Sequence, residues 1–234
     1  GPDRPGADRK PGPYRQSERH DQGLYLEYWK RLRDGGFIYP APYSRSEIQV
    51  AAAETGVGRG SHGEQIFPEI LRQPPSSALE FEKPGKMAFR FRVPDASILF
   101  DDVRLGETGF HSGRDFGDFL VWSPEGYPSY EFAVVVDDHL MGITEVVRGE
   151  DLLLSTARQL LVYEALGWKP PAFYHCALLR SRDGRRLSKR KGSTTLRGLL
   201  SAGWSATELL NAMDEGFRNS ALLDSISATG NSES

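Results

Sequence analysis

Residues 130–151 have the sequence YEFAVVVDDHLMGITEVVRGED, and this stretch carries most of the information about the fold class. Its apolar part, 132–136, is continuous, which is typical of a strand covered on both faces of a sheet. Two acids, Asp137 and Asp138, follow it directly. Ligands of open parallel sheets bind beyond the carboxyl ends of the strands, so the pattern predicts a strand over 132–136 with a site at its end.

The residues after this stretch continue a β–α–β order. Residues 144–147 predict a short strand that delivers Arg148. Residues 152–166 have the spacing of an amphipathic helix closed by Gly167, and residues 172–179 predict another strand. Alternation of strands and helices is typical of α/β proteins, so we expect an α/β core.

The remaining elements are short. A helical pattern begins at Ser17 and ends at Gly35 and Gly36. Ser-x-x-Glu capping boxes at 44–47 and 205–208 predict one helix to about residue 54 and another to residue 213. A further helix is predicted over 196–200, and strands are predicted over 89–93, 98–102 and 119–122.

A second informative stretch is residues 183–192, with the sequence DGRRLSKRKG. Five basic side chains occur within seven positions after an Asp-Gly turn. Lysine and arginine neutralise phosphate oxygens and Ser188 can donate a hydrogen bond, so the composition indicates a polyphosphate-binding loop. The alternative interpretation is an ordinary solvated basic turn.

Composition limits the function classes. The 234-residue chain has a formal net charge of −3, so no global basic field attracts nucleic acid, and any RNA contact must use local patches. Cys176 is the only cysteine, which excludes an intramolecular disulfide and every multi-cysteine metal site. No apolar run approaches the ~20 residues of a membrane helix, so we expect no membrane contact and a cytoplasmic location.

Together the two stretches resemble the catalytic domain of the glutamyl class I aminoacyl-tRNA synthetases. Residues 186–190, RLSKR, are similar to the Lys-Met-Ser-Lys-Ser signature of that class in its Leu-Ser-Lys-Arg form. Residues 12–19 and 43–45 also match the branch, and the resemblance extends from residue 1 to about residue 212. It implies a Rossmann-type class I synthetase core, incomplete at its N-terminus, with an α+β insertion that binds the acceptor stem.

The resemblance also implies a domain organisation. Residues 1–36 would form part of the catalytic core, residues 37–115 the acceptor-stem-binding insertion, and residues 116–217 the remainder of the core with the basic loop. Residues 218–234 are rich in Ser and Asn and predict a disordered tail.

The resemblance implies catalytic and binding roles for specific residues. Lys189 and Ser188 would be catalytic, because a cation and a donor there stabilise charge on leaving pyrophosphate. The residues implied in ATP binding are Arg186, Leu187, Lys189, Arg190, Glu150 and Asp151. Tyr130 and Arg148 would bind glutamate. Two parallel hydrogen bonds from Arg148 to a carboxylate would favour glutamate over glutamine.

Structural alternatives stay open for these residues. Arg148 can form a surface ion pair with Glu150 or Asp151. Tyr130 can be a core aromatic. Glu150 and Asp151 can also stabilise the N-terminus of the helix that follows them. Adjacent residues of a strand point to opposite faces, so Asp137 and Asp138 cannot both enter one site.

The implied cofactor is ATP with Mg²⁺, and the implied partners are tRNA, glutamate and ATP, with a monomer as the full-length form. Many family members carry a cysteine-based zinc site in the insertion. Here Ala41 and Tyr43 stand at the start of that region with no cysteine nearby, so we expect no zinc site.

The class binds ATP phosphates with a His-x-Gly-His sequence, and none occurs in this chain. We therefore expect either a fragment that begins after the first β–α unit or a paralogue without adenylation, and no ATP–pyrophosphate exchange by the chain as given. The short end after the basic loop favours the glutamyl-Q tRNA(Asp) synthetase branch. A glutamyl-tRNA synthetase fragment and a non-catalytic tRNA-binding paralogue are the alternatives.

Overall fold

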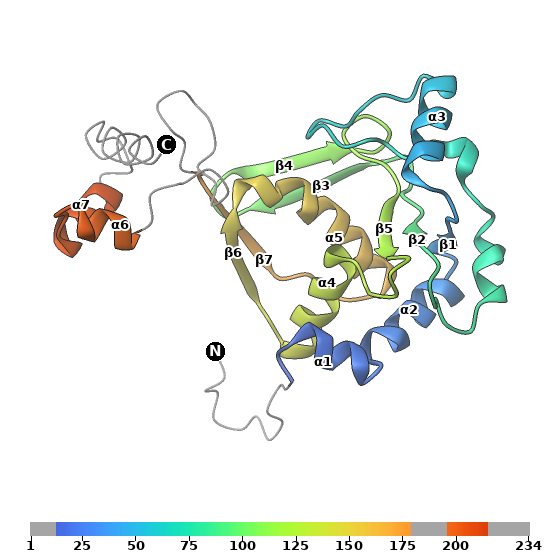
Figure 1. The fold of residues 1–234 in the computed structure, drawn as a ribbon, viewed down its shortest axis with the longest axis horizontal. Coiled ribbons are helices and arrows are strands. Elements are labelled where there is room, and N and C mark those ends of the chain that lie inside the picture. The colour runs from blue at the N-terminus through green and yellow to red at the C-terminus, as the bar shows by residue number, and fades with distance from the viewer. Residues whose placement is uncertain (1–12, 179–195, 215–234) are drawn as a thin grey trace. The chain divides into compact units, whose positions relative to one another are not determined.

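The structure is a computed structural model that describes residues 13–178 and 196–214. The chain divides into two compact units, the first ending at Cys176 and the second beginning at Ala177 (Figure 1). The predicted basic loop, with Arg186, Leu187, Ser188, Lys189 and Arg190, lies outside the described residues, as does the predicted tail at 218–234. The domain boundaries at residues 36 and 115 stay predictions.

Two helices open the first unit, where the sequence predicted one. α1 (Gln16–Asp21) and α2 (Leu24–Asp34) are separated at Gly23, which has a φ of 74°. A left-handed residue interrupts a right-handed helix, and glycine adopts that conformation without steric cost, so the chain turns there. The apolar face of α2 buries Tyr25, Trp29 and Leu32, as their spacing predicts.

An antiparallel sheet with the order β1–β2–β5 follows. It consists of β1 (Ile38–Pro40), β2 (Phe89–Phe91) and β5 (Phe119–Trp122). β2 and β5 confirm two predicted strands, whereas β1 is too short to show a period in the sequence. Between β1 and β2 lie α3 (Arg45–Thr55) and the 3-10 helices η1 (Glu69–Leu71) and η2 (Pro75–Glu80). Ser44 and Glu47 cap α3 reciprocally, which confirms the first capping box.

A second, mixed sheet has the order β4–β3–β7–β6. The hairpin of β3 (Ser97–Asp102) and β4 (Gly106–His111) is antiparallel, and β4 was not predicted. The strands β6 (Glu145–Gly149) and β7 (Ala172–Cys176) are parallel, and β3 joins them through the pairing of Asp102 with Phe173. In the β6–β7 register Arg148 lies opposite His175, which makes these two residues neighbours.

Residues 130–141 form a helix, α4 (Tyr130–Met141), so the prediction of a strand over 132–136 is wrong. Ser129 caps this helix by accepting a hydrogen bond from the backbone N–H of Phe132, and Gly142 ends it in the left-handed conformation. A helix surrounded by protein has the same continuous apolar run as a buried strand. α4 is such a helix, because it packs against α2, α5 and β5.

The β–α–β unit predicted after residue 143 is confirmed. β6 leads through a 3-10 turn, η3 (Glu150–Leu152), into α5 (Leu153–Ala165), and the chain then returns to β7 (Figure 1). α5 packs on α4, and one apolar core connects them with α2 and β2. The polar residues described below therefore lie on well-packed elements.

The second unit contains two short helices among its described residues, α6 (Leu196–Ser201) and α7 (Ala206–Asp214). Ser205 accepts a hydrogen bond from the backbone N–H of Glu208, while the Glu208 carboxylate accepts one from the backbone N–H of Ser205. This reciprocal pair confirms the second capping box.

Candidate active site

Arg148, near the carboxyl end of β6, is held by neutral acceptors. Its Nε donates to His175 Nε2 at 3.2 Å, and its Nη2 donates to Thr156 Oγ1 at 2.7 Å and to Gln159 Oε1 at 2.9 Å. The guanidinium carbon lies 5.2 Å from the centre of the Phe173 ring. Among the described residues, no carboxylate pairs with Arg148 and nothing accepts a hydrogen bond from its Nη1.

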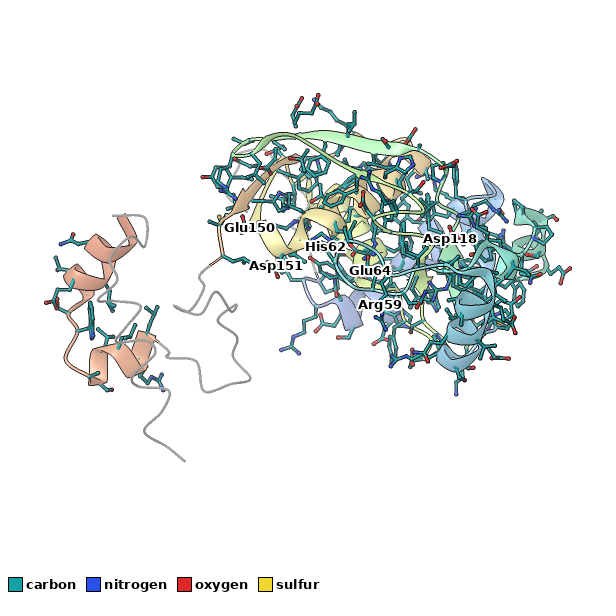
Figure 2. The ribbon with its side chains drawn as sticks, turned by 90° about the horizontal axis from the view of Figure 1, so that it is seen from above. Arg59, His62, Glu64, Asp118, Glu150 and Asp151 are labelled. Carbon is teal, nitrogen blue, oxygen red and sulfur yellow. The ribbon has the colours of Figure 1, made fainter. Side chains whose placement is uncertain are left out.

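The acids that follow Arg148 are not its partners. Glu150 pairs instead with Arg104, whose Nη2 lies 2.8 Å from the Glu150 Oε2. The alternative interpretation of Arg148 as a surface ion-pair residue is therefore wrong. Figure 2 shows Glu150 and Asp151 together, on the turn that leads into α5 and well away from Asp118. Their contact with ATP stays a prediction.

His175 is completely buried and joins Arg148 to Asp102. Its Nδ1 lies 2.6 Å from Asp102 Oδ2, which also accepts the backbone N–H of His175. The other oxygen of Asp102 accepts the backbone N–H groups of Arg104 and Leu105. Burial alone would raise the pKa of Asp102, but the hydrogen bonds from His175 and the two backbone groups outweigh it and hold that pKa below its usual range. Asp102 is therefore an anion that only accepts.

Gln159 connects Arg148 with a second buried acid. Its Nε2 donates to Glu131 Oε2 at 2.8 Å, and Ser155 donates to the other oxygen of Glu131 at 2.8 Å. Burial raises the pKa of Glu131, although these two hydrogen bonds oppose the shift. Because the Gln159 Nε2 donates to Glu131, the Gln159 Oε1 faces Arg148 and accepts from it. No local sequence pattern predicts the roles of Gln159, Thr156, His175 and Asp102, since they come from three separate elements.

Asp138 and Tyr163 are polar groups on the facing helices α4 and α5. Burial and then the charge of Asp137 raise the pKa of Asp138 to about 6. The Tyr163 hydroxyl is buried and has no hydrogen-bond partner among the described residues. Burial and then the charge of Asp138 raise the pKa of Tyr163. Arg148 acts in the opposite direction on both groups and lowers the pKa of each.

Tyr130 is the first residue of α4, and the residue is 51% exposed. The alternative that Tyr130 is a core aromatic is therefore wrong. Its contact with glutamate is compatible with this exposure and stays a prediction.

Asp137 anchors the first two helices. Its carboxylate accepts hydrogen bonds from Arg19 at 2.5 Å, from the Tyr25 hydroxyl at 2.9 Å and from Gln16 at 3.0 Å. The expectation that Asp137 and Asp138 point to opposite faces rested on a strand, and it does not apply because residues 130–141 form a helix. Of the two acids, Asp138 is the one whose side chain has no hydrogen bond to a described residue.

The described part of the chain shows neither a metal-binding cluster nor a membrane-spanning helix. No group of three or more His, Cys, Asp or Glu residues within 13–178 and 196–214 is placed to hold a metal ion. In the same residues, no helix combines the length and the apolarity needed to cross a membrane.

The arrangement defines an α/β protein with a cationic site at the carboxyl ends of the parallel strands β6 and β7. The family is given by the sequence as a whole. Residues 6–215 match the family model described as tRNA synthetases class I (E and Q), catalytic domain. The chain belongs to this family, which confirms the resemblance seen in its motifs and the predicted fold class.

Relatives within the family include two kinds of enzyme. The chain is 44% identical over 195 residues to the glutamyl-Q tRNA(Asp) synthetase of Symbiobacterium thermophilum, covering 83% of this chain and 59% of the relative. It is 40% identical over 192 residues to a glutamate–tRNA ligase of Bacillus cytotoxicus, covering 79% of this chain and 37% of the relative.

A solved structure is also similar. It is a glutamate tRNA ligase from Elizabethkingia meningosepticum in complex with its amino acid, with a TM-score of 0.59 and 32% identity. The match covers 77% of this chain and 37% of that chain. The chain thus spans less than two thirds of the length of each of these relatives.

Proposed function

We propose that this protein activates glutamate with ATP and transfers it to tRNA, and that Arg148 binds the side-chain carboxylate of glutamate. The observation that carries the proposal is an arginine near the carboxyl ends of two parallel strands whose hydrogen-bond partners, within the described part of the chain, are all neutral groups. A half-buried positive charge without a protein counter-ion attracts an anionic ligand, because pairing removes the electrostatic cost of burial.

The geometry supports discrimination between glutamate and glutamine. Nη1 of Arg148 is free of the described residues and can only donate hydrogen bonds. A carboxylate accepts from it with either oxygen, whereas the amide nitrogen of glutamine is itself a donor and would oppose it. Tyr130, exposed at the start of α4, is the proposed second contact to the amino acid.

The family resemblance supports the residues that we propose for the adenylation step. Lys189 and Ser188 would stabilise charge on the leaving pyrophosphate, with Arg186, Leu187 and Arg190 around the ATP phosphates. Glu150 and Asp151 are proposed contacts to ATP. Since no described group of acids is placed to hold a metal, Mg²⁺ would enter with ATP and be bound mainly by phosphate oxygens and water.

The tRNA is proposed to be tRNA(Asp), as in the glutamyl-Q branch. The relative that is 44% identical supports this choice, since it carries that name. Transfer of labelled glutamate to tRNA(Asp) and to tRNA(Glu), measured side by side, tests it. Transfer to tRNA(Glu) alone would contradict the branch and leave the glutamate site intact.

Calorimetric titration of the chain with glutamate and with glutamine tests the binding proposal. We expect glutamate to bind and glutamine to bind at least about tenfold more weakly, because one charged hydrogen bond is worth about 1.5–3 kcal/mol. Arg148→Ala removes the preference, and Arg148→Lys restores part of it, since lysine keeps the charge without the fork. Arg33→Ala, on α2, is the control and leaves both affinities unchanged. Equal affinities for the two amino acids in the native chain would refute the proposal.

A further inference from the structure

His175 and Asp102 form a buried pair that no motif of the chain includes. Both side chains are completely buried, and they belong to different strands, β7 and β3. Buried ionisable groups cost free energy unless each polar atom has a partner, so such a pair calls for a structural or a functional reason. The partners of the two residues provide that reason.

The hydrogen bonds determine which nitrogen of His175 carries the proton. Every contact made by the Asp102 carboxylate comes from a donor, so the Nδ1 facing it must carry a hydrogen. On the other side of the ring, Nε2 lies 3.2 Å from the Arg148 Nε and 3.0 Å from the Thr156 hydroxyl; a guanidinium can only donate, and the hydroxyl can donate as well. Nε2 is therefore the acceptor, and the ring is the neutral tautomer protonated at Nδ1.

This tautomer fixes the orientation of Arg148. The bond to His175 occupies Nε, while Thr156 and Gln159 occupy Nη2. One edge of the guanidinium is thus fully used, and the Phe173 ring covers one of its faces. The group cannot rotate without breaking these bonds, and Nη1 is the part left to meet a ligand.

The hydrogen bonds to His175, Thr156 and Gln159 also leave the positive charge of Arg148 available to an anionic ligand. Asp102 and Glu131 are linked to Arg148 by hydrogen bonds through the neutral side chains of His175 and Gln159, and neither carboxylate hydrogen-bonds directly to the guanidinium. A carboxylate placed directly on the guanidinium would neutralise it and compete with an anionic ligand. A neutral acceptor orients the same group without competing for its charge.

We propose that His175 is a positioning residue for Arg148, and that Asp102 fixes the tautomer in which His175 accepts the Arg148 Nε–H. The consequence for glutamate affinity rests on the function proposed above. The positioning itself is a property of the free chain and is tested without a ligand.

The first test is the nitrogen-15 NMR spectrum of the native chain with labelled histidine and arginine. We expect His175 to be protonated at Nδ1 and unprotonated at Nε2, and the Arg148 Nε–H to couple to the acceptor nitrogen across the hydrogen bond. A proton on Nε2, or an imidazolium, would overturn the proposal. This measurement uses no variant, so failure of a variant to fold does not affect it.

The second test compares two substitutions that separate the two ends of the ring. His175→Asn keeps a donor near the position of Nδ1 and loses the acceptor at Nε2. His175→Gln reaches the position of Nε2, where its oxygen can accept from Arg148. We expect His175→Asn to weaken glutamate binding by about tenfold and His175→Gln by less than about threefold, because only the first loses a hydrogen bond to the guanidinium.

The control is His139→Gln, at an exposed histidine that stacks on Trp168, and it leaves glutamate affinity unchanged. Equal weakening by His175→Asn and His175→Gln, in folded variants of a chain that binds glutamate, would overturn the positioning role. A native chain that fails to bind glutamate would instead refute the proposed function, and the NMR spectrum would still decide the positioning of Arg148.

Discussion

Replacing Asp137 tests whether the acidic pair in α4 is an anchor or part of the site. The Arg19 Nη1 lies 2.5 Å from Asp137 Oδ1, and the two side chains are 4% and 10% exposed. Removing one partner of a buried ion pair leaves the other charge without compensation, which costs about 3–5 kcal/mol. Asp137→Ala also leaves the buried hydroxyl of Tyr25 without its acceptor. We therefore expect the free energy of unfolding to fall by about 3–5 kcal/mol.

Urea denaturation followed by circular dichroism measures this loss at a fixed m-value. Asp34→Ala is the matched control, because the Asp34 side chain is 59% exposed and pairs with Arg33 at the surface. The control is expected to cost about 0–1 kcal/mol. The double variant Arg19→Met with Asp137→Leu should recover much of the loss, since it removes both charges. A cost for Asp137→Ala no larger than that of Asp34→Ala would refute the anchor role.

Further predictions concern the same helix and its neighbours. With a folded pKa of about 6 and an unfolded pKa near 3.9, Asp138 makes the folded state bind more protons between these values, so stability falls as pH rises from about 4 to about 6. Asp138→Asn should flatten this slope and raise the free energy of unfolding at pH 8 by about 1 kcal/mol. Partial exposure of Asp138 makes this gain smaller than the full pKa shift implies. An unchanged slope would show that Asp138 is not the titrating group. Ser129→Ala removes the N-cap of α4 and should cost about 1 kcal/mol, whereas Ser129→Asp should cost little; equal losses in thermal melts would contradict the capping role. Glu150→Gln removes the exposed pair with Arg104 and should change stability by less than about 1 kcal/mol, and a larger loss would assign Glu150 a structural role.

Local signals in the sequence predicted the local structure well. Both capping boxes are present with reciprocal bonds, at Ser44 with Glu47 and at Ser205 with Glu208. The position of Arg148 near the end of a parallel strand was also predicted. These features depend on residues a few positions apart, which a sequence shows directly.

Two features, the helical state of residues 132–136 and the partners of Arg148, could not be predicted from the sequence for physical reasons. The apolar run at 132–136 has no period, because α4 is surrounded by α2, α5 and β5, and burial on all sides removes the difference between helix and strand. The partners of Arg148 depend on sheet register: His175 and Asp102 are 73 positions apart and meet only because β3 and β7 pair. The sequence therefore indicates Arg148 as a candidate residue but not the buried side chains that orient it.

The proposed glutamate site depends on the Arg148 Nη1, which no described residue accepts from and which is oriented toward the ligand by the bonds at Nε and Nη2. Its most direct test is an NMR titration of the Arg148 side-chain N–H signals with glutamate and, separately, with glutamine. We expect a saturable shift of the Nη1 signals with glutamate, a much weaker response to glutamine, and little change at Nε, which stays bound to His175. Saturation by glutamate with unchanged Arg148 signals would contradict it.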